Sequence, residues 1–440
     1  MTYEDKLKKA TFNLWSFAIS KFLSSMGGNV FSFGISLFIL GTTGSATSFA
    51  INLLSSSLPR AILSPISGYI ADKYSKKLII ITSQFISILI VSSLLIFSLV
   101  YELNLIAIYV TTALLSIFSM FSGITFTSAI ANLVDHNRIQ KAIAFNQTSI
   151  SISTIAAPVL GGFLYGIFTI ELFLVFHIIT FLLAITFQFQ IDFKLFKKES
   201  PTNKFSQNEG FISSYKLSYQ YLKKEKTLLI VLYTAFIVNF FYAAITVGLP
   251  FILIEQLSIE PEHFGIIEGS FAAGMLMASL YFSVKKEFQY PLIILKRGVF
   301  VIAFNMICFI IPIIFSMSYS LTVFYFITLV LIIGMTIMFI NTPIGVIIQK
   351  GVDDSLRGKI FATMESVATF LSPISFIIYG FLFDLIGIVW TVIPTALLMT
   401  LYTTTVISKK NIKLAYPAYN PKNLRLVFKK IIKNIKIQKS

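Results

Sequence analysis

Charged residues are scarce in this sequence. Only 12% of its 440 residues are Asp, Glu, Lys or Arg, while 56% are hydrophobic. Soluble domains carry about 25% charged residues, which they need to cover a water-exposed surface. The composition therefore excludes an ordinary soluble protein.

Cysteine and clustered metal ligands are also lacking. Cys308 is the only cysteine, so an intramolecular disulfide and a thiolate metal cluster are both excluded. His136, His177 and His263 lie far apart without ligand spacing, so we expect no metal site. No Gly-x-x-x-x-Gly-Lys-Ser/Thr sequence occurs, which excludes a P-loop ATPase within this chain. Catalytic side chains do not cluster at one depth, so we predict that the protein is not an enzyme.

Long apolar runs are what the sequence has in abundance, with 45 Phe among them. Each run exceeds the roughly 20 residues that a helix needs to cross the hydrocarbon of a bilayer. The predicted spans are 12–40, 46–70, 78–101, 105–133, 141–167, 171–191, 227–254, 261–284, 298–316, 321–349, 360–383 and 387–408. The fold class that we predict is an all-α polytopic membrane protein, with 12 transmembrane helices in two six-helix bundles.

The net charge of +16 comes from basic residues that lie in the hydrophilic connectors between the apolar runs. With the N-terminus inside, the external loops contain no Lys or Arg. All basic residues except Lys21 and Arg60 then lie in cytoplasmic loops, tails or helix ends. This is the positive-inside pattern of a bacterial plasma-membrane protein. It predicts cytoplasmic N- and C-termini and no nucleic-acid partner.

Two hydrophilic segments divide the chain. We predict an N-terminal bundle at 1–191, a cytoplasmic linker at 192–226, a C-terminal bundle at 227–408 and a basic tail at 409–440. Apolar residues between Leu424 and Ile435 recur at helical spacing, with lysines between them. This pattern predicts an amphipathic helix on anionic lipid, the alternative being a solvated tail.

The connector after the second span carries a motif. It reads Gly68-Tyr69-Ile70-Ala71-Asp72-Lys73-Tyr74-Ser75-Lys76-Lys77. A glycine, an aspartate four positions later and a basic cluster resemble the signature loop of the major facilitator superfamily. There Gly68 would permit close helix contact, and Asp72 would cap a helix or pair with a cation of the other half. The basic members of this gating loop are Lys73, Lys76 and Lys77. Ser75 stands where the family usually has glycine.

The fifth span contains a second element, Ala156-Ala157-Pro158-Val159-Leu160-Gly161-Gly162. It resembles an element of the superfamily's drug/proton antiporters, in which Pro158 would favour a bend while Gly161 and Gly162 permit close packing. A plain packing role is the alternative. Together with the stretches from Leu58 to Pro65 and from Val352 to Lys359, it resembles the macrolide-efflux and enterobactin-exporter branch.

Charges inside a membrane are costly and usually functional. Arg60 lies about 18 Å along the helix from Asp72, near mid-membrane. The other intramembrane charges are Lys21, Glu268 and Glu365. The two carboxylates are candidates for proton coupling, because a carboxyl shielded from water binds a proton more readily. The alternatives are a structural ion pair and a helix-end side chain, and Gln147 is a further candidate for the substrate path.

The resemblance implies a secondary active transporter that exports drug-like or amphipathic small molecules, macrolides included, by alternating access. It would confer antibiotic resistance as a proton antiporter, with the proton gradient as energy source and no cofactor. We expect a monomer whose partners are its small-molecule substrate and the lipid bilayer. The alternatives are a lipid, siderophore or peptide carrier of the same fold, and a membrane sensor that does not transport.

Overall fold

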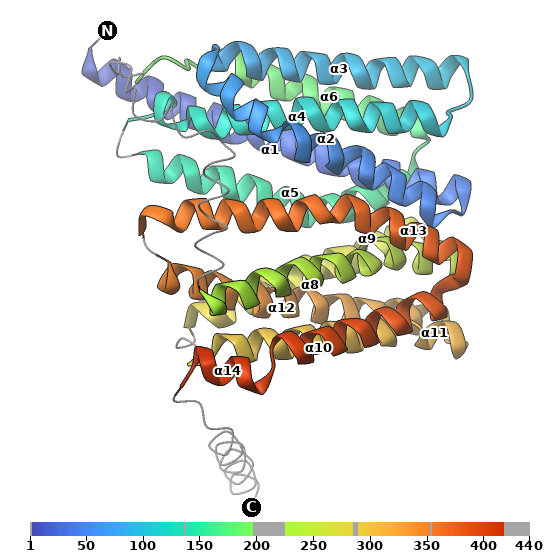
Figure 1. The fold of residues 1–440 in the computed structure, drawn as a ribbon. Helices are drawn as coiled ribbons and strands as arrows, with labels where there is room; N and C mark the ends of the chain where they lie inside the picture. Colours follow the sequence, from blue (N-terminus) through green and yellow to red (C-terminus); the bar gives the residue numbers. More distant parts are fainter. Residues whose placement is uncertain (1, 136–137, 197–224, 285–288, 353, 418–440) are drawn as a thin grey trace, which may run out of the picture.

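The protein is a bundle of long, roughly parallel and antiparallel helices (Figure 1). The computed structural model describes residues 2–135, 138–196, 225–284, 289–352 and 354–417. The first half comprises α1 (Tyr3–Thr43), α2 (Ala46–Lys73), α3 (Lys76–Val100), α4 (Leu105–Leu133), α5 (Ile139–Ile167) and α6 (Ile170–Gln190). The second half comprises α8 (Lys226–Pro250), a π-helix η3 (Phe251–Gln256), α9 (Pro261–Val284), α10 (Pro291–Cys308), α11 (Ile311–Ile314), α12 (Tyr319–Gly351), α13 (Asp354–Val406) and α14 (Lys409–Ala415).

Ten helical stretches of the described residues are long and apolar enough to cross a membrane. One of them, Phe370–Val406, is divided by Gly387, whose backbone angles (φ 78°, ψ 177°) are not helical. The described part of α2 is not among the ten, because Asn52, Arg60 and several serines interrupt its apolar sequence. With α2 included and α13 counted as two spans, the described helices account for the twelve predicted, and the all-α membrane fold is confirmed.

Several predicted boundaries were wrong for identifiable reasons. Helix α1 begins nine residues before the predicted start at position 12, because Thr2 and Asp5 form a reciprocal capping box there. Helix α10 likewise begins earlier, with Pro291 in its first turn. The predicted loop at 384–386 is absent, because the chain turns at Gly387 alone.

The two halves repeat one packing scheme. In the first half α1 packs against α5 and α6, while α4 packs against α2 and α3. In the second half α8 packs against α13, while α12 packs against α9 and α10. Across the boundary α2 meets α13 and α5 meets α9. The described ends of the chain, in α1 and α14, lie at the same end of the bundle (Figure 1), which we name the terminal end, the opposite one being the far end.

The halves differ in their cores. The second half contains one large apolar cluster, which extends into the first half at the far end through Leu37, Leu40 and Phe49. The first half contains two separate clusters, one around Phe31 and Phe173 and the other around Phe17 and Phe126. Its helices therefore leave room between them for polar side chains.

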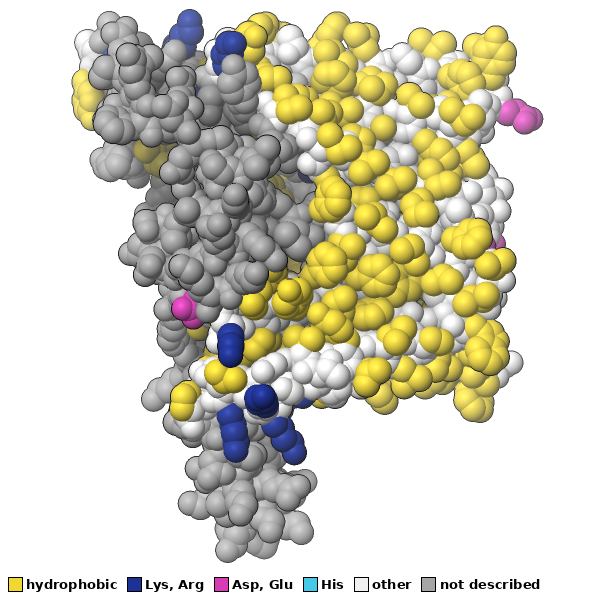
Figure 2. All heavy atoms as spheres, viewed as in Figure 1, with side chains coloured by type: hydrophobic (Ala, Val, Ile, Leu, Met, Phe, Trp, Pro, Cys, Tyr) yellow, Lys and Arg dark blue, Asp and Glu magenta, His cyan; other side chains and the backbone are white. Residues whose placement is uncertain are grey.

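The outer surface has the pattern that a bilayer requires. Large apolar side chains cover the visible face of the helices, and the visible Lys and Arg side chains gather at the terminal end (Figure 2). Trp390, Leu280 and Ile106 are among the most exposed apolar residues. Such a band of exposed apolar side chains is expected against lipid hydrocarbon.

Candidate functional site

A cavity of about 1650 Å³ lies between the helices of the first half and borders the second. All six helices of the first half contribute to its lining, whereas the described residues of the second half contribute Phe236 from α8 and Phe370 from α13. The lining extends from Ser32, past the middle of α1 on its far-end side, to Ser128, near the end of α4. The cavity therefore extends from the middle of the bundle toward the terminal end.

Two of the predicted intramembrane charges line this cavity. Lys21 projects from α1 and Arg60 from α2, and the two cations are near enough to interact electrostatically. The Lys21 amino group also lies close to α4, since a Cβ added to Gly123 would be 3.8 Å from it. The structure thus brings together two charges that are 39 positions apart in the sequence.

The predicted acidic residues are placed differently. Glu268 lies half-buried in α9 and is not among the cavity-lining residues. It lies within electrostatic range of the hydroxyl of Tyr242 in α8. The side chains of Glu365 and Gln147 lie outside the described residues, so their predicted roles stay predictions.

Polar side chains that the sequence analysis did not single out line the cavity. Gln84 of α3 is 4% exposed, and its amide oxygen accepts hydrogen bonds from Ser24 (2.9 Å) and from Gln188 of α6 (3.3 Å). The amide nitrogen of Gln84 and the hydroxyl of Thr112 have no partner among the described residues. Buried polar groups nearly always find partners, so these two atoms mark a polar part of the cavity wall.

At the far end, glycines bring α5 and α9 into backbone contact. A Cβ on Gly162 would lie 2.4 Å from the carbonyl oxygen of Pro261, and a Cβ on Gly265 would lie 2.5 Å from that of Pro158. Phe33 and Phe264 stack beside this crossing, with ring centroids 5.3 Å apart. The predicted element of the fifth span thus lies at the boundary between the halves.

Gly161 has a different neighbour from Gly162. Its Cβ would lie 2.9 Å from the ring of Phe33 in α1, so Gly161 packs within the first half. The spacing Gly265-x-x-x-Gly269 in α9 was the sequence signal for the partner surface, since this motif is typical of close helix crossings in membranes.

Asp384 of α13 forms a second far-end contact between the halves. Its carboxylate accepts hydrogen bonds from the backbone N–H groups of Ala46 (2.9 Å) and Thr47 (2.9 Å) and from the Ser45 hydroxyl (2.7 Å). It therefore caps the N-terminus of α2, where unsatisfied N–H groups and the helix dipole favour an anion. Nearby, a Cβ on Gly380 would lie 2.6 Å from the Cβ of Ala50.

The described lysines of the signature loop contact the first half. Lys77 donates hydrogen bonds to the carbonyls of Phe189 (2.9 Å) and Ile191 (3.3 Å) at the end of α6, and Lys76 donates to Ser128 O (2.5 Å). A cation is favourable at a helix C-terminus. Lys73 is exposed, with its amino group 5.8 Å from the ring centroid of Tyr74. The surroundings of Gly68 and Asp72 lie outside what the structure describes, so the close helix contact of Gly68 and the cap or ion pair of Asp72 stay predictions.

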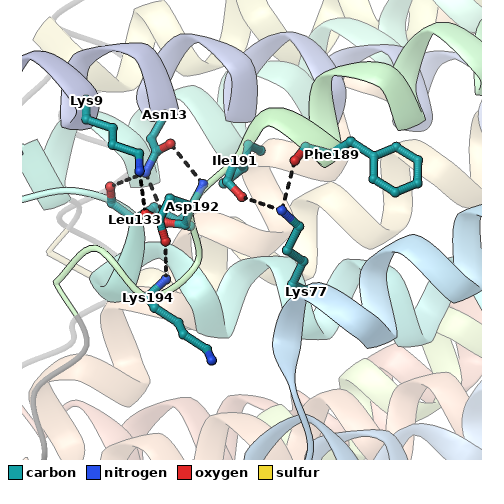
Figure 3. A network of polar contacts seen from close by, with 8 residues as sticks. All are labelled: Lys9, Asn13, Lys77, Leu133, Phe189, Ile191, Asp192 and Lys194. Carbon is teal, nitrogen blue, oxygen red and sulfur yellow. Dashed lines mark hydrogen bonds and ion pairs between the residues drawn. The ribbon is translucent and has the colours of Figure 1, made fainter.

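Lys77 borders a polar network that ties α1 to the chain after α6 (Figure 3). Asp192 pairs with Lys9 (2.7 Å), and its backbone exchanges hydrogen bonds with the Asn13 amide. Burial alone would raise the pKa of the Asp192 carboxyl. Hydrogen bonds from Lys9 and from the backbone N–H of Lys194, with the charge of Lys77 nearby, hold that pKa below its usual value.

The comparisons with known proteins decide the family. The sequence matches the Major Facilitator Superfamily over residues 17–376. The chain belongs to the major facilitator superfamily. It is a multi-pass membrane transporter, as predicted, and not an enzyme.

Curated relatives within this superfamily are distant. Macrolide efflux protein A of Streptococcus pyogenes is 23% identical over 75% of this chain and 79% of its own length. An MFS-type transporter of Bacillus subtilis named YfiS is 26% identical, over 81% of this chain and 84% of its own. In structure, the chain is similar to a bacterial homologue of the iron transporter ferroportin in its inward-facing state. That likeness has a TM-score of 0.66 at 14% identity and covers 90% of this chain and 99% of the other. It concerns the fold alone.

Proposed function

We propose that this transporter exports amphipathic small molecules by alternating access, driven by the proton gradient. The observation that carries the proposal is the cavity of the first half, which borders the second half, combined with close contacts between the halves at the far end. A carrier of two repeated halves exposes such a site to one side at a time by rocking the halves.

The relatives support the direction of transport. The curated protein from Streptococcus pyogenes is named for macrolide efflux, and its similarity extends over 75% of this chain. We place the termini and the terminal end of the cavity in the cytoplasm, because the basic connectors lie there. The cavity would then take up its cargo from the cytoplasm or the inner leaflet and release it after the far end opens.

Glu268 and Glu365 are our candidates for proton coupling. Glu268 is half-buried in the boundary helix α9, adjacent in sequence to Gly269 and within electrostatic range of the Tyr242 hydroxyl in α8. A carboxyl in a helix that moves against the other half would change its access to water in each cycle, which is the property that proton coupling requires.

The first test is accumulation of a macrolide in cells that produce the protein, with and without a protonophore. We expect lower accumulation than in control cells and a return to the control level when the protonophore collapses the gradient. Unchanged accumulation would contradict macrolide export, and lower accumulation that survives the protonophore would contradict proton driving.

A disulfide lock tests alternating access itself. The Ser45 hydroxyl and the Asp384 carboxylate are 2.7 Å apart across the far end. In a Cys308→Ala background, Ser45→Cys combined with Asp384→Cys should abolish transport under oxidation, and a reductant should restore it. Each single-cysteine variant is the control, which oxidation should leave unchanged. Transport that persists in the oxidised, cross-linked double variant would show that the far end need not open.

A further inference from the structure

We propose that the cavity binds the anionic head of an amphipathic molecule between Lys21 and Arg60. The inference rests on the proposed transport function for its biological meaning, since it names the chemistry of the cargo. The binding itself is a separate property of the cavity and is measured without transport.

Charge is the first argument. Lys21 and Arg60 both line the cavity and act on each other electrostatically. Among the described lining residues there is no Asp or Glu to neutralise them. Two like charges that share one site among apolar helices destabilise each other, and an anion placed between them relieves that repulsion. A cation is disfavoured at this place, so a macrolide, which carries a basic amine, would be held by other parts of the cavity than this pair.

Hydrogen-bond donors are the second argument. The Gln84 amide nitrogen and the Thr112 hydroxyl are buried, line the cavity and have no partner among the described residues. The guanidinium of Arg60 adds a planar fork that fits two oxygens of one carboxylate, sulfonate or phosphate.

The apolar walls supply the third argument. Phe31 and Phe181 line the cavity from the first half, and Phe236 and Phe370 line it from the second. Aromatic side chains from both halves suit an apolar body that touches each half as they rock. The cargo that fits is therefore an amphiphile with an oxyanion head.

A matched pair of fluorescent probes tests the inference. 8-Anilinonaphthalene-1-sulfonate and N-phenyl-1-naphthylamine share one aromatic body and differ by the sulfonate. The purified protein is placed in nanodiscs of zwitterionic lipid, and the signal of empty nanodiscs is subtracted. We expect the wild type to bind the sulfonate about tenfold or more tighter than its neutral twin, as a charge-assisted contact provides. Equal affinities would overturn the proposal.

Variants locate the site. Arg60→Gln and Lys21→Gln should each weaken sulfonate binding about tenfold and leave the neutral twin nearly unchanged. Arg60→Lys and Lys21→Arg should retain most of the affinity. Lys226→Gln removes an exposed cation outside the cavity lining, so it is the matched control for a general charge effect and should change neither probe. A sulfonate preference that survives removal of both cavity cations would overturn the assignment.

Charge reversal guards against misfolding as the explanation. Arg60→Glu should lose the sulfonate and bind the cationic dye rhodamine 6G about tenfold tighter than the wild type does. Misfolding exposes apolar surface and raises the binding of both dyes, so a gain for the cation combined with a loss for the sulfonate cannot arise from it. No gain of rhodamine 6G binding would count against the proposal. Because these measurements need no gradient, loss of gradient-driven export would refute the proposed function while leaving the anion site standing, and the converse also holds.

Discussion

Helix α9 has two close-packed faces, and they lie in different surroundings. Toward α12, within the second half, a Cβ on Gly334 would lie 1.9 Å from the carbonyl oxygen of Phe271. Toward α5, across the boundary, a Cβ on Gly265 would lie 2.5 Å from that of Pro158. The local chemistry of the two crossings is the same, a glycine against a backbone carbonyl.

The surroundings of the two crossings differ. Ile333 and Phe326 of α12 belong to the large apolar cluster of the second half, in which the α9–α12 crossing is embedded. The α5–α9 crossing has a charged side chain at its margin, since a Cβ on Gly166 would meet the Glu262 carboxylate. Close packing is therefore common to both crossings, and the charged margin is what sets the α5–α9 crossing apart. We expect the first crossing to hold through the transport cycle and the second to open.

The largest effect is expected at the crossing within the second half. Gly334→Ala should force α9 and α12 apart and destabilise the fold, because the new methyl group would clash with the carbonyl oxygen of Phe271. Overpacking of this kind costs about 1–3 kcal/mol or more. Thermal unfolding in detergent measures the loss. Gly345→Ala is the matched control in the same helix, since a Cβ there meets nothing within 4 Å. Equal stability of the two variants would contradict the geometry.

The crossing between the halves should respond differently. Gly162→Ala introduces a clash with Pro261 that separation of the halves relieves, so we expect a folded protein whose far end opens more often. A bias of about 1.4 kcal/mol changes the population ratio tenfold. In a Cys308→Ala background, the maleimide labelling rate of Ala46→Cys, a buried far-end position, measures the opening. A variant as unstable as Gly334→Ala would show instead that this crossing is permanent.

The smallest shift is expected from the Asp384 cap. Asp384→Asn keeps the shape but removes the charge and one acceptor for the N–H groups of α2. Loss of a helix cap costs about 0.5–2 kcal/mol, so far-end labelling should rise modestly. Glu102→Gln removes an exposed acid beyond the end of α3 and is the control for charge alone. If both variants label alike, the cap contributes nothing to closure.

The helices could be predicted from the sequence because lipid imposes a length and a polarity on every span. Their ends could not, because they depend on local geometry such as the Thr2–Asp5 capping box and the turn at Gly387. Hydropathy is averaged over many residues and so locates a span, whereas a cap or a turn depends on one or two residues and is lost in that average.

The charged residues of the cavity could be predicted from the sequence, whereas its uncharged polar residues could not. Lys21 and Arg60 were identified because a charge within an apolar run is conspicuous, and the structure places both in the cavity. Gln84 and Thr112 were missed, because a polar residue in a membrane helix indicates nothing about the helix opposite. Asp384 was missed because an acid at the predicted end of a span resembles an ordinary solvated residue.

The single-residue corner at Gly387 has a consequence for the lipid. The Thr391 hydroxyl donates to the carbonyls of Gly387 (2.7 Å) and Leu382 (3.2 Å), which ties the two arms of the corner together. Trp390, just beyond it, is 73% exposed, a position that suits the interfacial region of a bilayer. Asp384 lies on the arm before Gly387. Tilting of the arm that carries Trp390 would therefore move the contact between Asp384 and the N-terminus of α2. We therefore expect bilayer thickness to change the tilt of this helix, so that thin and thick membranes favour different conformations of the transport cycle.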